Sequence, residues 1–215
     1  MEIAKVDHTS GLGIFAKSKR VVTKQDWEDA KTVSREMCDW LDAENGKFSG
    51  QHARAYAMAH AQVAPIADPW MLFVVDKSLV IAEKQDKEGK QTLENAYFEA
   101  QAIFNVDILE SPDKIEKEIP KRRLIEDKDK KGEFHMEVYK AKENISNIIN
   151  VPEACMSFPF RKERKMDRFY SIRVSYQYLN QKGKVKDFVG WVNGLKAHII
   201  QHEVGHFNAQ NIFHK

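Results

Sequence analysis

The sequence is short of several features that would define other classes of protein. It contains two cysteines, Cys38 and Cys155, so a framework of disulfides is excluded. No apolar run is long enough to cross a membrane, and residues 1–7 lack the apolar core of a signal peptide. Internal repeats and long linkers are absent as well. These absences predict a soluble, cytoplasmic protein that does not bind membranes.

An excess of charge of either sign is also missing. The 34 basic and 32 acidic residues leave a formal net charge of +2, so the charge balance does not indicate a nucleic-acid-binding protein. The length of 215 residues suits a single domain over residues 1–215, with an insert rich in Lys, Glu and Asp at about 112–150. We expect this insert to be a solvated elaboration of the surface. The alternative is a contact surface for the ribosome or another partner.

The most informative pattern lies near the C-terminal end, at His202-Glu203-Val204-Gly205-His206. Two histidines four residues apart share one face of a helix, where both imidazoles can bind one metal ion. Glu203, enclosed by this pair, can then act as general base towards a water at the metal. The motif therefore predicts a metal-dependent hydrolytic site.

The motif does not by itself identify a third ligand. The usual downstream position, six residues after His206, is occupied by Ile212, which cannot bind a metal. His214 is available, but it lies near the end of the chain. His198 shares the helix face, yet it would be roughly 12 Å from His206 along the axis, too far for both to bind one ion. We therefore expect the third ligand to come from upstream.

Cys155 is the better candidate for this ligand. It lies in a short apolar stretch bounded by Pro152 and Pro159, which is typical of an extended segment. A thiolate and two imidazoles leave the fourth position open, as in catalytic zinc sites. The alternative is that Cys155 is a small buried apolar residue. Cys38 falls within a predicted helix, where core packing is its expected role.

The spacing of apolar residues predicts an α+β fold. Thr23 and Asp26 indicate a capped helix start, and apolar residues follow at helical spacing until Asn45-Gly46. A second helix is expected from a cap at Asn193 through the metal motif. Strands are expected at residues 70–82, 97–109, 169–179 and 185–192, the last two forming a hairpin. We expect antiparallel sheets packed around a central C-terminal metal-binding helix, with an N-terminal helix beside them.

Three stretches together resemble the signature motifs of the peptide deformylase family. Residues 55–62 resemble its G-φ-G-φ-A-A-x-Q motif, residues 153–157 its E-G-C-L-S motif, and residues 202–206 its H-E-x-D-H motif. The three occur in the family's order. The resemblance covers most of the chain and is strongest from Val151 onward. It implies the same α+β architecture.

The resemblance also implies a role for each matching residue. The metal ligands would be Cys155, His202 and His206. Glu203 would be the base, while the Gln62 side-chain amide and the Met156 backbone N–H would stabilise the oxyanion. The implied reaction removes the formyl group from N-formylmethionyl nascent peptides and releases formate. Fe(II) is the implied ion, with zinc or nickel as substitutes.

Four departures from the family motifs replace a glycine or an aspartate. Ala55, Ala57 and Ala154 stand where the family has glycine, and Gly205 stands where it has aspartate. Each alanine adds a Cβ where positive φ or close approach to a substrate can be required, and the aspartate would have supported the metal site. Two alternatives to a deformylase follow. One is a metal-holding relative without turnover that acts as a binding protein, and the other is a zinc endopeptidase of the HExxH type.

Overall fold

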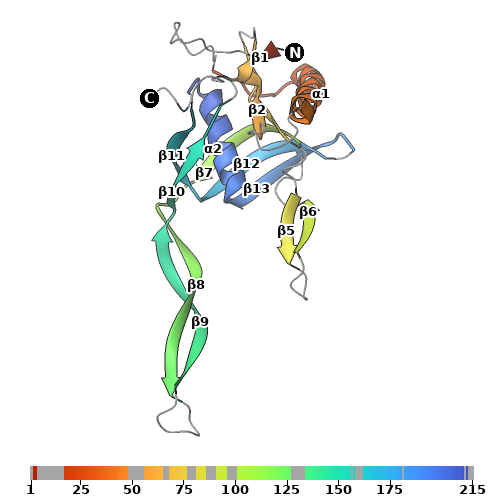
Figure 1. Cartoon of the computed structure of the whole chain (residues 1–215). Coiled ribbons are helices and arrows are strands. Elements are labelled where there is room, and N and C mark those ends of the chain that lie inside the picture. Colours follow the sequence, from red (N-terminus) through yellow and green to blue (C-terminus); the bar gives the residue numbers. More distant parts are fainter. Residues whose placement is uncertain are drawn as a thin grey trace.

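A five-stranded antiparallel sheet forms the framework of the molecule (Figure 1). In spatial order its strands are β13 (Val185–Asn193), β12 (Ser171–Leu179), β7 (Ala102–Glu110), β4 (Leu72–Val75) and β2 (Ala57–Ala59). The computed structural model describes residues 2–3, 17–47, 56–64, 68–76, 81–85, 91–95, 101–126, 134–155, 157, 162–180, 182–210 and 212. For these residues the predicted α+β class and antiparallel pairing are confirmed.

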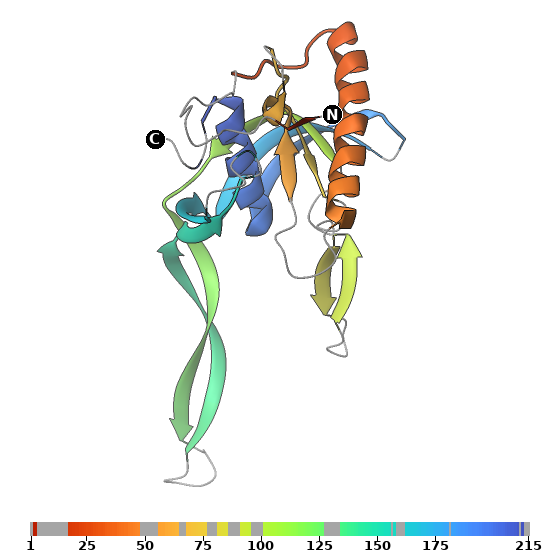
Figure 2. The ribbon, with the colours of Figure 1, turned by 45° about the horizontal axis from the view of Figure 1, so that its top comes forward.

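Each face of this sheet is covered by one helix, as Figure 2 shows. Helix α1 (Lys24–Lys47) packs on one face and helix α2 (Leu195–Phe207) on the other. The sheet residues facing α1 include Met58, Leu72, Val74, Ala102 and Phe104, and those facing α2 include Ala59, Phe73, Val75 and Ile103. Because side chains alternate along a strand, β4 buries all four of its residues. The sheet thus holds α2 on a rigid layer.

The start of α1 was predicted correctly. The Asp26 backbone N–H donates to Thr23 Oγ1 at 3.1 Å, and the Thr23 N–H donates to Asp26 Oδ2 at 2.9 Å. This reciprocal pair satisfies two backbone donors that a helix start would leave open. The helix ends at Lys47, slightly beyond the predicted stop at Asn45-Gly46. Cys38 is half-buried and packs against the core that α1 forms with the sheet.

The hairpin that leads into α2 was also predicted, but the helix cap was not. Strands β12 and β13 pair in antiparallel register from Ser171↔Asn193 to Leu179↔Val185. Helix α2 then begins at Leu195, and its N-cap is Gly194 with φ 59°, a conformation that favours glycine. The expected cap at Asn193 is therefore wrong, because Asn193 is still the last residue of β13.

Two small two-stranded pairings bring further segments towards α2. Strand β10 (Ile148–Glu153) pairs with β11 (Arg164–Phe169), and Cys155 follows β10 directly. On the other side, β2 continues into the 3-10 turn η1 (His60–Gln62) and then into β3 (Val63–Ala64). Strand β3 pairs with β1 (Glu2–Ile3). These segments carry the remaining site residues predicted from the sequence.

The charged insert forms a long two-stranded ribbon, made of β8 (Lys114–Glu126) and β9 (Phe134–Ser146). We call it the arm. In Figures 1 and 2 it projects away from the sheet and twists about its own axis. Ion pairs join its strands: Lys142–Glu116, Arg123–Glu137, Lys140–Glu118 and Lys121–Glu143. Its side chains are largely exposed, as expected for a surface elaboration.

One strand prediction is wrong in extent. Residues 70–82 were expected to form a single strand, but β4 ends at Val75 and β5 starts at Ile81 in a different pairing. Strand β5 (Ile81–Gln85) pairs only with β6 (Gln91–Asn95) among the described residues. The high density of β-branched and aromatic residues indicated strand without showing where one ends. None of the helices described in the structure is long and apolar enough to span a bilayer.

Candidate metal centre and active site

Three side chains predicted to be metal ligands converge in the structure. His202 and His206 lie one turn apart on α2, and their Nε2 atoms are 3.2 Å apart. Cys155 Sγ lies 3.5 Å from His206 Nε2. All three donor atoms lie within 4.8 Å of one another, and within the described residues this is the one such cluster of His, Cys and acidic side chains. The arrangement can hold one metal ion and leave a coordination position open.

A buried ion pair orients the first histidine. His202 Nδ1 donates to Glu153 Oε2 at 3.0 Å. Arg168 in turn donates to both oxygens of Glu153, from Nε at 2.6 Å and from Nη2 at 2.8 Å. Because Nδ1 is held in this way, Nε2 of His202 is the nitrogen that faces Cys155 and His206. A carboxylate on the far side of a ligand imidazole is a frequent support of metal sites.

Burial and close contacts shift the pKa values of the ionisable groups in the cluster. Burial lowers the pKa of His202, but hydrogen bonds to Cys155 and Glu153 outweigh it and raise that pKa to about 10. Burial raises the pKa of Glu153, yet bonds from Arg168 and His202 bring it to about 2. Burial holds the pKa of His206 well below its usual value. A cysteine sulfur, a histidine supported by a carboxylate and a second histidine that stays neutral form a donor set that fits a divalent metal ion.

Glu203 lies within the same buried site. Its side chain is only 3% exposed, and Oε2 has no hydrogen-bond partner among the described residues. Burial raises the pKa of Glu203 to about 7, while the charge on His202 partly opposes this shift. A carboxylate is suited to accept and return a proton when its pKa is close to neutrality and one of its oxygens has no hydrogen-bond partner.

Gln62, the last residue of η1, contacts Cys155. Its Oε1 accepts from the Ala59 N–H at 2.8 Å, so its amide group has a defined orientation. Its Nε2 then donates to Ser157 Oγ at 3.2 Å and lies 3.6 Å from Cys155 Sγ. Gln62 and Ser157 are both fully buried. The amide N–H groups of Gln62 therefore point towards Ser157 and Cys155.

Two of the departures from the family motifs cause no backbone strain. Asn105 and Ala209 are the non-glycine residues with positive φ among the described residues, so Ala57 and Ala154 need no glycine conformation. At Gly205 a Cβ would meet only the Gln210 carbonyl oxygen, at 3.8 Å. We expected the missing aspartate there to deprive the metal site of a supporting carboxylate. Glu153 supplies such a carboxylate to His202 instead.

The remaining predicted residues lie outside the cluster or outside the described residues. His198 is half-buried one turn before His202 and does not belong to the three-ligand group. Met156, Ala55 and His214 lie outside the described residues, so the role of the Met156 N–H stays a prediction.

Glu153, Arg168 and Ser157 were given no role from the sequence. Glu153 and Ser157 each lie two residues from Cys155. In an extended segment this spacing places side chains on the same side of the chain, so it could have indicated that both lie near Cys155. No sequence signal indicated Arg168.

His60 provides a test of how the first motif packs against Trp70, which lies just before β4. Its ring is 3% exposed and stacks on Trp70, whose backbone N–H donates to His60 Nδ1 at 2.9 Å. Burial lowers the pKa of His60 from 6.5 to about 4. Between these values the unfolded chain binds a proton that the folded chain does not. The free energy of unfolding should therefore decrease by about 3 kcal/mol as the pH falls from 6.5 to 4.

The measurement is urea unfolding at several pH values, with His60→Asn beside the parent. Asparagine keeps an acceptor for the Trp70 N–H but does not titrate. The variant should lose stability less steeply than the parent below pH 6.5. Parallel curves for the two proteins would contradict a buried neutral His60.

Comparison with known proteins identifies the family of the chain. A family model described as polypeptide deformylase matches residues 1–215. The chain belongs to this family. Polypeptide deformylases are metal-dependent hydrolases that remove N-formyl groups, so the chain is an enzyme acting on formylated peptides. The resemblance inferred from three short motifs is confirmed. No curated protein matches the chain.

Solved structures of peptide deformylases share its fold. One is a probable peptide deformylase of Synechococcus phage S-SSM7, with a TM-score of 0.53 and 17% identity over 99% of this chain and 97% of that one. Another, from Vibrio parahaemolyticus bacteriophage VP16T in complex with actinonin, has a TM-score of 0.54 and 16% identity, covering 99% and 100%. A Met-Ala-Ser-bound deformylase from Acinetobacter baumannii has a TM-score of 0.52 and 17% identity, covering 99% and 96%. At 16–17% sequence identity, these solved structures show that the fold is shared.

Proposed function

We propose that this deformylase acts on N-formylmethionyl nascent peptides in the cytoplasm, with Cys155, His202 and His206 as its metal ligands. The observation that carries the proposal is the convergence of these three donor atoms within 4.8 Å, beside a buried glutamate. A structural metal site would have no use for Glu203, because a base serves only turnover. The Met-Ala-Ser peptide bound by the relative from Acinetobacter baumannii supports a methionine-first substrate.

The bound ion would supply Lewis acidity, which lowers the pKa of water and polarises a carbonyl group. Glu203 would accept the proton of the attacking water at its unpartnered Oε2 and later deliver it to the departing amine nitrogen. Gln62 would donate from Nε2 to the formyl oxygen as negative charge develops there. The backbone N–H of Met156 would be the second donor. Formate and a free N-terminus are the products.

The ligand set also bears on the identity of the metal. A thiolate donates more charge than a third imidazole and is a softer ligand, which suits Fe(II) or zinc and admits nickel. We propose Fe(II) as the ion used in the cell, by analogy with the family. The α2 helix, with two ligands and the base on adjacent turns, would be the central metal-binding element of the fold.

The proposed function is tested by formate release. Protein purified without oxygen and loaded with Fe(II) or Ni(II) should release formate from formyl-Met-Ala-Ser, and a chelator should stop the reaction. Acetyl-Met-Ala-Ser and an unblocked peptide serve as controls. Cleavage of internal bonds in the unblocked peptide would indicate an endopeptidase. A fully metallated protein that releases no formate would indicate the binding-protein alternative.

The ion pair behind His202 leads to a second prediction. Glu153→Gln removes the charge that holds His202 Nδ1, so metal affinity should fall about 10–100-fold. Competition with a chromophoric chelator measures this directly. Glu110→Gln is the matched control, because Glu110 pairs with Arg173 at an exposed position on the sheet. Equal metal affinity of Glu153→Gln and the parent would show that the ion pair is only structural.

A further inference from the structure

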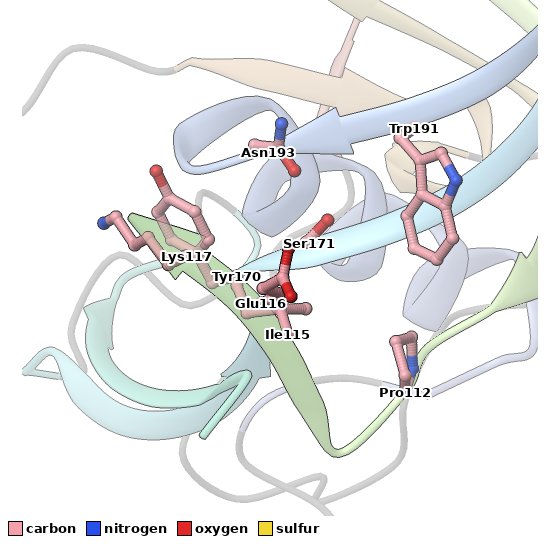
Figure 3. A pocket seen from close by; sticks show the side chains of 8 residues that line it. All are labelled: Pro112, Ile115, Glu116, Lys117, Tyr170, Ser171, Trp191 and Asn193. Atoms are coloured by element: carbon pink, nitrogen blue, oxygen red, sulfur yellow. The ribbon is translucent and has the colours of Figure 1, made fainter. Parts of the chain in front are cut away.

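A short junction joins β11 to β12 beside the metal centre. It consists of Phe169, which ends β11, then Tyr170, and then Ser171, which begins β12. The junction borders a hollow of about 470 Å³ at the base of the arm, and Figure 3 shows Tyr170 and Ser171 in its lining. Because side chains do not fill this hollow, the hydrogen bonds of the junction carry much of the restraint on its position.

Two side-chain amides hold the ends of the junction in the same way. Gln201 of α2 accepts from the Phe169 N–H at 3.0 Å and donates to the Phe169 C=O at 2.8 Å. Asn147, at the base of the arm, accepts from the Ser171 N–H at 2.8 Å and donates to the Ser171 C=O at 2.7 Å. Each amide therefore pairs with one residue of backbone as a neighbouring strand would.

Only one of these two amides belongs to the metal-binding helix. Gln201 directly precedes His202 on α2, and its partner Phe169 follows Arg168 on β11. Arg168 in turn donates to both oxygens of Glu153. The Glu153 carboxylate accepts from His202 Nδ1. Gln201 therefore closes a ring of contacts that begins and ends at His202.

The support of His202 comes from a different element from His202 itself. Glu153 ends β10 and Arg168 lies on β11, whereas His202 lies on α2. A hydrogen bond weakens steeply when its distance or angle departs from the preferred range. Glu153 can therefore orient the imidazole only while α2 keeps its spacing from the β10–β11 pair. The two bonds from Gln201 to the Phe169 backbone fix this spacing.

We propose that Gln201 is a positioning residue of the metal centre, which holds α2 at a set distance from β11 and so directs His202 Nε2 at the ion. It acts through Phe169 and the ion pair behind His202, and not by binding the metal. The inference rests on the proposed role of His202 as a ligand. An imidazole that is already aimed at the ion loses less freedom when it binds, which raises the affinity of the site.

The test uses Gln201→Met, which keeps the length of the side chain but removes its bonds to Phe169 and to the Ala197 C=O. The affinity of the metal-free protein for Ni(II), measured by competition with a chromophoric chelator, should fall about tenfold. In a double-mutant cycle with Glu153→Gln the two losses should not add, because Gln201 acts through Glu153. Unchanged affinity for Ni(II) overturns the inference, and so do strictly additive losses.

Asn147→Leu is the matched control. The Asn147 amide also makes three hydrogen bonds, two to Ser171 and one to the Pro112 C=O, and the residue is fully buried. Without metal, this variant should lose at least as much thermal stability as Gln201→Met, yet it should bind Ni(II) as tightly as the parent. An equal loss of affinity in both variants would mean that the whole junction is merely structural, and it would overturn a specific role for Gln201.

Substitutes cover the case in which a variant does not fold. Gln177→Met can replace Asn147→Leu, because it is the same change as Gln201→Met at a position away from the metal ligands. Gln201→Asn can replace Gln201→Met, because its amide is one methylene shorter and cannot make both bonds to Phe169. Unchanged affinity of a folded Gln201 variant overturns this inference alone. A metallated parent that releases no formate overturns the proposed function alone.

Discussion

Replacing Glu203 by glutamine is expected to lower kcat for a formylated peptide by about 10²–10⁴-fold, the usual contribution of a general acid–base group. The amide has nearly the shape of the carboxylate but cannot accept the proton of the attacking water. Because Glu203 is not one of the three proposed ligands, metal content should remain that of the parent. The measurement is formate release per metal ion, with the metal determined by plasma emission spectrometry.

The control for this prediction is His206→Gln, which removes a ligand. It should lose metal and activity together, whereas Glu203→Gln should lose activity alone. If Glu203→Gln released formate at the rate of the parent, the proposed proton transfer would be wrong. Another group would then have to accept the proton.

Replacing Gln62 by methionine is expected to lower kcat by about 10²–10³-fold with little change in KM, the result seen when one oxyanion donor is lost. Methionine has a similar length but no N–H to donate. The observation behind this prediction is the fixed orientation of the amide, with Oε1 on the Ala59 N–H and Nε2 towards Cys155. Ser157→Ala should have a smaller effect in the same direction, since it frees the amide without removing it.

Gln177→Met is the matched control for Gln62→Met. The Gln177 amide donates to Asp187 and accepts from Asn105 on the face of the sheet away from the metal ligands. Its loss should lower the melting temperature without lowering kcat in metal-loaded protein. An unchanged kcat in folded, metallated Gln62→Met would remove Gln62 from the mechanism.

The sequence predicted that His202 and His206 come together because the decisive spacing is local. Two histidines four residues apart face the same way on any α-helix, so His202 and His206 needed only the helix to form. The β12–β13 hairpin was predictable for a similar reason. Its apolar residues alternate, and a short turn separates the strands.

The errors arose where local patterns do not determine the answer. Residues 70–82 are uniformly rich in strand-forming residues, so nothing in that run marked the break between β4 and β5. Asparagine is a favourable N-cap residue, but the backbone of Asn193 pairs with Ser171 at the end of β13. The N-cap of α2 is therefore the next residue, Gly194. Strand pairing outweighed the local preference for a cap.

By itself, the sequence determined the α+β class, the family and the two-histidine motif, since these depend on periodicity and on residues close together in the chain. The motifs predicted Cys155 as the third ligand, and the tertiary structure brings its sulfur to His206 across 51 positions. Only the tertiary structure decided that Glu153, held by Arg168, supports His202. It also decided that the charged insert is an arm whose strands carry exposed apolar side chains and whose base borders a hollow. Contacts of this kind depend on how distant segments pack, and no local pattern encodes them.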